Sequence, residues 1–162
     1  MKKSTHKLDR QERDILRVLQ LDGRISNVDL AERVSLSESP CYRRVRALEE
    51  SGVIEAYSAR INQRSIGLQV TAFVLVTLEK PDDRKTTGFL SRVEAEEHIV
   101  ECHAMSGSSD FLLKVVARSM DHFSDLVMER ILKFPGVKNV ESNFSLRAVK
   151  EHSALPLPAG EA

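Results

Sequence analysis

The sequence predicts an α+β protein made of two parts, an N-terminal winged helix-turn-helix domain and a C-terminal ferredoxin-like βαββαβ domain. Two observations lead to this prediction. Apolar residues repeat with a helical period as far as Gly52, and with the period of a strand from Val70 onward. The charge also differs between the halves, because residues 1–64 hold 13 Lys and Arg against 10 Asp and Glu, whereas residues 65–162 hold 11 against 14. A basic half joined to an acidic half indicates two tasks, one of them with a polyanion.

Three short helices are expected in the first part. The first ends at Asp22-Gly23, a pair that favours a helix stop. Ser26 begins the second with capping-box-like spacing, and Ser37 caps the third, which ends at Ser51-Gly52. A tight turn between the last two gives the helix-turn-helix plan. Residues 53–61 are β-prone, and a strand there would make the domain a winged variant.

The second part follows the order β-α-β-β-α-β. Strands are expected at residues 70–78, 99–105, 111–117 and 137–149, and helices at 84–96 and 120–133. The first of these helices is expected to turn Phe89, Leu90 and Val93 inward. The first strand is apolar on both faces, and only one face can cover the two helices. We therefore expect the other face to pair with another subunit.

These elements set the expected domain boundaries. The helix-turn-helix domain takes residues 1–61, and a linker with a break at Gly67 takes residues 62–68. The βαββαβ domain takes residues 69–150. The tail 151–162 is expected to be disordered, because it is built of small residues and proline.

Composition and motifs exclude several classes of protein. No apolar run is long enough to span a bilayer, and the N-terminus lacks the apolar stretch of a secretory signal. Two cysteines do not form a disulfide framework, which favours a reducing cytosol. Nucleophile-elbow, metalloprotease, Walker and dinucleotide-binding motifs are absent, so we expect no catalytic residue and no cofactor. His98, Cys102 and His103 are close in sequence, but a strand points Cys102 and His103 to opposite faces, so we expect no metal site.

The third expected helix has one face suited to DNA. At 100° per residue, Cys41, Val45 and Leu48 share the side that packs on the other helices. The opposite side carries Ser39, Arg43, Arg46 and Glu50, flanked by Tyr42 and Arg44. Arginine can make paired hydrogen bonds to guanine in the major groove, and the Arg, Ser and Tyr side chains can all hold phosphate. The alternative is a solvated face whose arginines pair with Glu49 or Glu50.

The segment from Leu8 to Ile54 resembles the DNA-binding domain of the Lrp/AsnC feast/famine transcription regulators, most specifically in DGRISNVDLAERV and SPCYRRVRALEESGVI. In that family a βαββαβ effector-binding and oligomerisation domain follows. Its local signature, a G-x-x-D-[FY] turn between the second and third strands, is present here from Gly107 to Phe111. The resemblance covers about residues 8–150.

The sequence departs from the family pattern at two positions. Ser35 stands in the turn where the family often has glycine, and a left-handed serine there would cost on the order of 1 kcal/mol. Tyr42 stands where the family usually has leucine, next to the arginines of the third helix. Both departures bear on which operator sequence the protein reads.

The resemblance implies a function and the residues that carry it. The protein would be a sequence-specific DNA-binding transcription regulator whose assembly or DNA binding responds to an amino acid or related small metabolite. The implied DNA contacts are Ser37, Ser39, Tyr42, Arg43, Arg44 and Arg46. The implied effector-binding residues are Met105, Ser106, Gly107, Ser108, Ser109 and Asp110. The implied partners are double-stranded DNA, the effector and further copies of the chain, which would form dimers assembled into octamers. The implied location is the cytoplasm of a bacterium or archaeon, in association with the nucleoid.

The chemistry of the implied effector turn fits a zwitterion. Backbone N–H groups of a Gly/Ser turn can take a carboxylate, and Asp110 can take an ammonium group. A plain hairpin explains the same residues, with Gly107 needed for positive φ and Asp110 bonded to its own backbone.

Three other functions fit parts of the sequence. The same arginine face would serve a nucleoid-organising protein that binds DNA with little sequence preference. Some tetrapyrrole decarboxylases share the fold of the family, so the fold by itself does not exclude chemistry. A sensing protein whose first half binds another protein is the third alternative.

Overall fold

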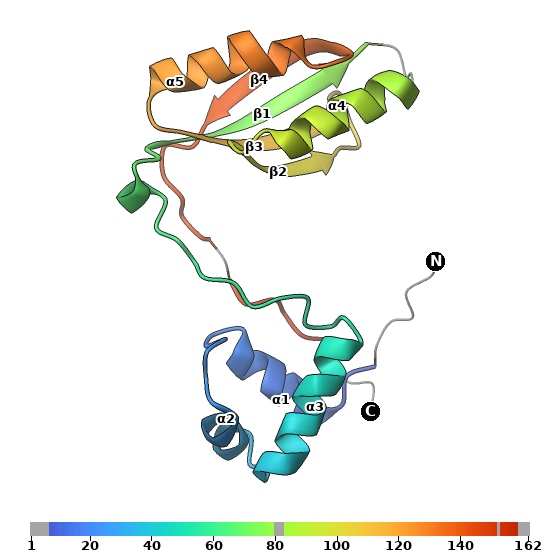
Figure 1. The fold of residues 1–162 in the computed structure, drawn as a ribbon, viewed down its shortest axis with the longest axis vertical. Helices are drawn as coiled ribbons and strands as arrows, with labels where there is room; N and C mark the ends of the chain where they lie inside the picture. Colours follow the sequence, from blue (N-terminus) through green and yellow to red (C-terminus); the bar gives the residue numbers. More distant parts are fainter. Residues whose placement is uncertain (1–6, 80–82, 152, 159–162) are drawn as a thin grey trace. The chain divides into compact units, whose positions relative to one another are not determined.

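The computed structural model describes residues 7–79, 83–151 and 153–158 of the 162. The chain divides into two compact units (Figure 1). A helical unit comprises the chain up to Arg60 together with the residues from Lys150 onward, and a sheet unit comprises Ile61–Val149. The chain therefore leaves the helical unit, builds the sheet unit and returns. The predicted α+β class is confirmed.

Three helices build the helical unit: α1 (Arg10–Leu19), α2 (Asn27–Arg33) and α3 (Glu38–Glu50). Their shared core consists of six buried residues, Ile15, Leu16, Leu30, Ala31, Cys41 and Leu48. The burial of this aliphatic surface holds the three helices together. A short turn separates α2 from α3, which gives the predicted helix-turn-helix.

Side-chain caps fix where these helices begin. Asp9 and Glu12 form a capping box at α1, in which the Glu12 N–H donates to Asp9 Oδ1 at 2.8 Å and the Asp9 N–H donates to Glu12 Oε2 at 2.9 Å. The Ser26 hydroxyl accepts the Asp29 N–H at 3.1 Å and starts α2. Ser37 occupies the N-cap position of α3, but the predicted side-chain cap is wrong, since the hydroxyl makes no capping hydrogen bond.

The turn between α2 and α3 contains a left-handed serine. Ser35 has φ 55°, and no other non-glycine residue of the described chain has positive φ. The following Leu36 N–H donates to the Ala31 carbonyl at 2.9 Å and closes the turn. The Cβ of Ser35 makes this conformation unfavourable by on the order of 1 kcal/mol relative to glycine.

The strand expected over residues 53–61 is not formed. The N–H groups of Val53 and Ile54 both donate to the Leu48 carbonyl at 3.0 Å, and residues 55–62 then run without regular secondary structure. A β-prone segment needs a second strand to supply its hydrogen-bond partners. The sheet of the described chain pairs only strands of the sheet unit, so this segment has no such partner.

Residues 153–158 also differ from the prediction, which was a disordered tail. The Gln20 side chain, at the end of α1, donates to the Leu155 carbonyl at 3.3 Å and accepts the Leu155 N–H at 2.5 Å. Leu157 packs against the helical core. Composition does not reveal this docking, because Gln20 lies 135 residues earlier in the chain.

The sheet unit has four antiparallel strands in the order β2-β3-β1-β4. These are β1 (Val70–Leu78), β2 (Ile99–Ala104), β3 (Phe111–Ala117) and β4 (Val137–Phe144). Helix α4 (Asp83–Ala95) and a second helical segment, Met120–Lys133, pack on one face of this sheet (Figure 1). Side chains of that face, including Val74 and Leu113, form one core with Phe89 and Leu126 from the helices.

Three details of the sheet unit differ from the sequence prediction. The last strand ends at Phe144 and not at residue 149. Leu90 is 40% exposed, so only Phe89 and Val93 of the three expected residues turn inward. The second helical segment changes type along its length: α5 (Met120–Asp125) continues as a π-helical turn, η2 (Leu126–Arg130), and a 3-10 turn, η3 (Ile131–Lys133).

Candidate nucleic-acid interface and ligand-binding turn

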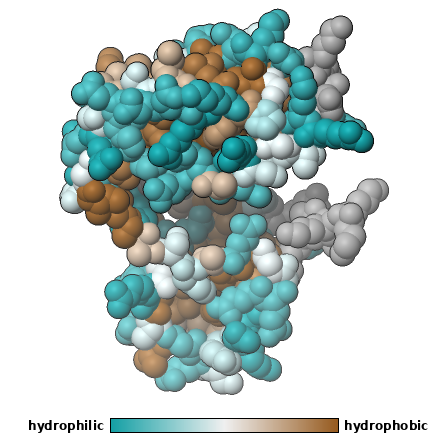
Figure 2. Space-filling model, turned by 45° about the horizontal axis from the view of Figure 1, so that its top comes forward, coloured by the Kyte–Doolittle hydropathy of each residue, from teal (hydrophilic) through white to brown (hydrophobic). Residues whose placement is uncertain are grey.

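Helix α3 presents an exposed polar face that holds Ser37, Ser39, Tyr42, Arg43 and Arg46. Cys41 and Leu48 on the other side are fully buried, and Val45 packs against the same core. The burial of these residues fixes the rotation of α3 and turns the polar face to solvent. Hydrophilic side chains accordingly cover much of the visible surface of both units (Figure 2).

Arg44 differs from the other candidates because it is half-buried and already paired. Its guanidinium donates to Asp9 Oδ2 at 2.5 Å and connects α3 to the capping box of α1. Burial raises the pKa of Asp9, but hydrogen bonds from the Glu12 N–H and from Arg44 outweigh this and lower the pKa overall. Arg44 therefore positions α3 within the unit.

Arg43 and Arg46 have different surroundings on the exposed face. Arg46 pairs with Glu49 at 3.0 Å and with Glu50 at 3.6 Å on its own helix, as the solvated-face alternative predicts. Arg43 has no hydrogen-bond or ion-pair partner among the described residues. Of the three arginines, Arg43 is thus the one available to an external anion without a prior exchange of partners.

Tyr57 adds a contact that the sequence did not predict. Its hydroxyl donates to Glu49 Oε1 at 3.1 Å, while Arg46 donates to the other oxygen of the same carboxylate at 3.0 Å. Burial, and then the neighbouring Glu49 carboxylate, raises the pKa of Tyr57, so the phenol stays protonated as a donor. The segment after α3 has no periodic pattern, so nothing in the sequence indicated this contact.

The residues expected to bind the effector form the turn between β2 and β3. Met105 is 43% exposed, Ser109 is half-buried, and Ser106, Gly107 and Ser108 are exposed. Gly107 has φ 154°, and a Cβ built there would meet nothing within 4 Å. The backbone conformation therefore favours glycine at this position, and close packing does not require it.

Asp110 has a structural contact in this turn. Its Oδ2 accepts the Leu78 N–H at 2.7 Å, next to the point where the β1–β4 register shifts between Thr77 and Leu78. The hairpin alternative predicted a bond to the turn's own backbone, whereas the observed donor lies on a neighbouring strand. This bond joins the end of β1 to the start of β3 and orders the turn.

The backbone of the same turn offers donors to a ligand. The Met105 N–H donates to the Asp110 carbonyl at 2.9 Å and closes the turn. Within the described chain, no protein acceptor takes the N–H groups of residues 106–109. Successive free N–H groups form an anion-binding concavity, which suits a carboxylate.

Two further features bear on the kind of site. Cys102 packs against the core and His103 is exposed, so their side chains lie on opposite faces of β2. In the described ranges, no group of His, Cys, Asp and Glu residues is arranged to hold a metal ion. Across the same ranges, no helix is long and apolar enough to cross a membrane.

Comparisons with known proteins match both units. Residues 8–55 match the family described as "Winged helix-turn-helix DNA-binding", and residues 71–155 match the "Lrp/AsnC ligand binding domain". The leucine-responsive regulatory protein of Rhizobium meliloti (strain 1021) is 42% identical over 144 residues, which are 89% of this chain and 92% of that protein.

Solved structures with similar folds cover both units as well. A transcriptional regulator from Neisseria meningitidis, in complex with L-methionine, is 37% identical with a TM-score of 0.89, covering 92% of this chain and 96% of that one. A feast or famine regulatory protein from M. tuberculosis, complexed with L-methionine, is 34% identical with a TM-score of 0.80, covering 89% and 95%.

Proposed function

The chain belongs to the Lrp/AsnC family of transcriptional regulators, and on this premise we propose that it binds operator DNA through α3 and changes its DNA occupancy when an amino acid binds at the turn 105–110. The observation that carries the DNA-binding part is Arg43, an exposed and unpaired arginine on the second helix of a helix-turn-helix. Such a helix places its exposed residues in the major groove.

Each residue proposed for DNA contact has a role that follows from its surroundings. Arg43 reads a base edge or holds a phosphate directly. Arg46 leaves Glu49 and Glu50 and binds phosphate instead. Breaking these two ion pairs costs little free energy, because exposed ion pairs contribute only about 0–1 kcal/mol. Ser37, Ser39 and Tyr42 supply hydroxyl donors, and Arg44 contributes by holding α3 in place.

The proposed effector is a small zwitterion, and the turn offers complementary charges. The free N–H groups of residues 106–109 receive its carboxylate, and the Asp110 carboxylate supplies the negative charge that an ammonium group requires. Met105 gives apolar contact to the side chain of the effector. Two related regulators of solved structure contain L-methionine, which supports an amino acid as the effector class.

Self-association completes the proposal. Phe73 is 38% exposed and Leu75 and Leu112 are half-buried, on the sheet face opposite the helices. An apolar sheet face of this kind is suited to pairing with a second copy, and a dimer presents two α3 helices to two half-sites. We propose dimers that assemble further into octamers, acting in the cytoplasm on the nucleoid.

Operator binding by the double variant Arg43→Ala/Arg46→Ala tests the DNA-binding assignment. We expect an affinity loss of tenfold or more, with the matched control Arg17→Ala on α1 binding as the wild type does, since Arg17 is exposed and pairs with Asp14 on its own helix. Equal affinity of the double variant and the wild type would refute the assignment to α3. Equal affinity of the wild type for operator and random DNA would favour the nucleoid-organising function instead.

A thermal-shift screen against the twenty amino acids tests the effector. A ligand at about 100 times its dissociation constant stabilises the folded state by about 2.7 kcal/mol, which moves the melting temperature visibly. The hit is expected to lose its effect when Gly107 is replaced by Val, which the backbone conformation disfavours. No stabilisation by any amino acid would contradict this effector class.

A further inference from the structure

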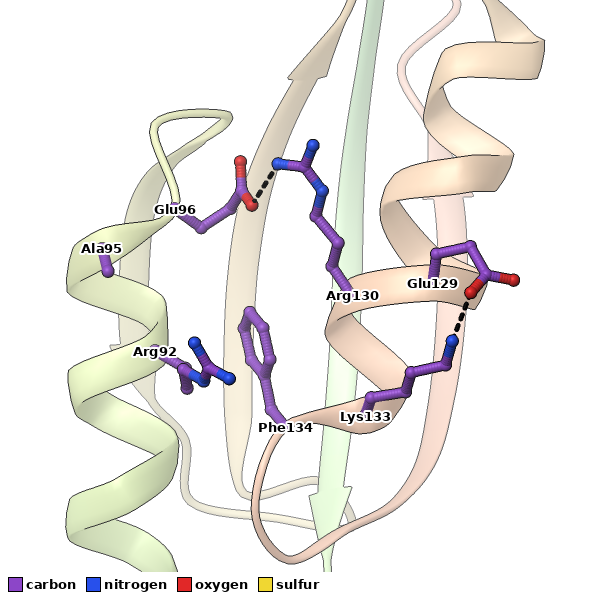
Figure 3. A pocket seen from close by; sticks show the side chains of 7 residues that line it. All are labelled: Arg92, Ala95, Glu96, Glu129, Arg130, Lys133 and Phe134. Carbon is purple, nitrogen blue, oxygen red and sulfur yellow. Dashed lines mark hydrogen bonds and ion pairs between the residues drawn. The ribbon is translucent and has the colours of Figure 1, made fainter.

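A pocket of about 360 Å³ lies on the helical face of the sheet unit, between the end of α4 and the irregular end of the second helical segment (Figure 3). This volume is within the range of small-molecule sites. Arg92 and Glu96 line it from the side of α4, and Arg130, Lys133 and Phe134 line it from the other side. The turn 105–110 contributes nothing to the lining, so the pocket is a separate site.

The lining carries an excess of positive charge. Its carboxylates are both engaged: Glu96 accepts from Arg130 at 2.9 Å and from His98, and Glu129 accepts from Lys133. Glu96 is 9% exposed, and although burial raises its pKa, the hydrogen bonds from Arg130 and His98 lower it overall, so Glu96 is ionised.

Arg92 is the unbalanced cation of the pocket. It is exposed, and among the described residues it has no hydrogen-bond or ion-pair partner. With Arg130 and Lys133 each balanced by one carboxylate, the guanidinium of Arg92 supplies the net charge of the lining. A planar guanidinium binds carboxylate or phosphate with two parallel hydrogen bonds.

The backbone beneath the pocket is irregular. Leu126–Arg130 forms a π-helical turn, and Arg130, where this turn meets the 3-10 turn, has φ −124° and ψ −68°, outside the usual helical values. The change in helix type lies where Glu129, Arg130 and Lys133 line the pocket (Figure 3). Such π turns within helices occur frequently at functional sites.

From these observations we propose that the pocket binds a small organic anion, with its carboxylate or phosphate group on Arg92 and its apolar part against the ring of Phe134. Arg130 and Lys133, each balanced by a carboxylate, line the same pocket without adding to its net charge. Glu96 keeps Arg130 in place through its ion pair. This site is independent of the effector turn and of DNA binding.

Isothermal titration of the full-length protein tests the proposal with two probes, inorganic phosphate and succinate, in separate arms at constant ionic strength with chloride as the reference salt. We expect at least one probe to bind the wild type and to bind Arg92→Gln at least tenfold more weakly. The arm that shows binding identifies the group that the site prefers. The control Arg64→Gln removes an arginine elsewhere in the sheet unit and is expected to bind as the wild type does.

A second variant tests the charge balance. Glu129→Gln removes a carboxylate and releases Lys133, so the affinity is expected to rise severalfold. Because Arg92 and Glu129 are both exposed, Arg92→Gln and Glu129→Gln are expected to keep the wild-type melting temperature. Absence of binding by both probes, or equal binding by Arg92→Gln and Arg64→Gln, would overturn the proposal.

Discussion

Arg44 and Asp9 lie 35 residues apart in sequence, and the guanidinium of the first donates to Oδ2 of the second at 2.5 Å. Asp9 also caps α1 through Oδ1, so one carboxylate starts α1 and holds α3. The ion pair itself is partly exposed, and such pairs contribute only about 0–1 kcal/mol. The pair therefore contributes little to stability but links α1 to α3, which carries the proposed DNA contacts.

Asp9 variants separate these two roles. Asp9→Asn keeps a good helix cap and loses the ion pair, so we expect it to lower the free energy of unfolding by less than about 1 kcal/mol. Asp9→Ala loses both and is expected to cost about 1–2 kcal/mol. Urea unfolding measures both values, and equal losses in the two variants would contradict a separate capping contribution.

The contribution of Arg43 to DNA recognition is expected to exceed that of its neighbours. If Arg43 reads a guanine, Arg43→Ala costs about 1–3 kcal/mol of operator affinity and relaxes specificity at one position of the site. If it holds phosphate, affinity falls on all sequences and the salt slope decreases by about 1. Titrations on operator and random DNA at several salt concentrations distinguish the two, and an unchanged affinity on both DNAs excludes either contact.

Asp110 variants test whether its carboxylate acts on the effector or only on the fold. Asp110→Asn keeps an oxygen that can accept the Leu78 N–H, so the melting temperature is expected to stay near that of the wild type, while effector binding weakens with the loss of charge. Asp110→Ala leaves the Leu78 N–H without its acceptor and is expected to cost about 1 kcal/mol of stability. If Asp110→Asn binds the effector as tightly as the wild type, Asp110 has only the structural role.

The stability of the sheet unit is expected to fall on acidification near neutral pH. His122 Nδ1 accepts the Arg118 N–H at 3.3 Å, which requires this nitrogen to be unprotonated. Burial, then the charges of Arg118 and His98, lowers the pKa of His122 below its ordinary value of 6.5. The native state therefore favours neutral imidazole, and this stabilisation is present above pH 6.5 and is lost as the pH falls through the lower native pKa.

Urea unfolding at pH 7.5 and pH 5.5, two values chosen on either side of the ordinary histidine pKa of about 6.5, measures this effect. We expect the loss of stability on acidification to be smaller in His122→Gln than in the wild type. His103→Gln, on the exposed side of β2, serves as the control and is expected to keep the wild-type loss. A loss that is identical in His122→Gln and the wild type would contradict the prediction.

The docking of the tail on α1 predicts a contrast between two leucines. Leu157→Ala removes a side chain that packs on the helical core and is expected to lower the stability of the helical unit by about 1 kcal/mol. Leu155→Ala is the control, because the Leu155 side chain is exposed and only its backbone bonds Gln20. Melting curves compare the two, and equal melting temperatures would show that Leu157 does not stabilise the unit.

Periodicity was sufficient to predict most of the fold. The apolar positions of α3, such as Cys41 and Leu48, repeat every three or four residues because the helix must bury one stripe. The order of strands and helices in the sheet unit follows from the change to a period of two at Val70. The sequence left open whether Ser35 is left-handed, and the structure shows that it is, with φ 55°.

The features that sequence did not reveal depend on partners distant in the chain. The segment 53–61 lacks a strand because β-propensity does not supply a second strand. The pairing of Arg44 with Asp9 and the docking of Leu155 on Gln20 depend on tertiary packing, which no local pattern encodes. At the pocket, the π turn places Arg130 near Glu96 in a segment that reads as an ordinary helix.

Because the chain returns to the helical unit, two connections join the units, and the effect of one proteolytic cut depends on which connection it breaks. The two connections leave the sheet side by side, since Ala72 pairs with Phe144 and the Ser145 N–H donates to the Thr71 carbonyl at 2.9 Å. Cleavage within residues 145–151 leaves the units covalently joined through residues 55–62. Cleavage within 55–62 separates the three helices covalently from the sheet unit, to which the docked tail 153–158 remains attached. The site of one proteolytic nick therefore decides whether the DNA-binding and ligand-binding halves remain covalently joined.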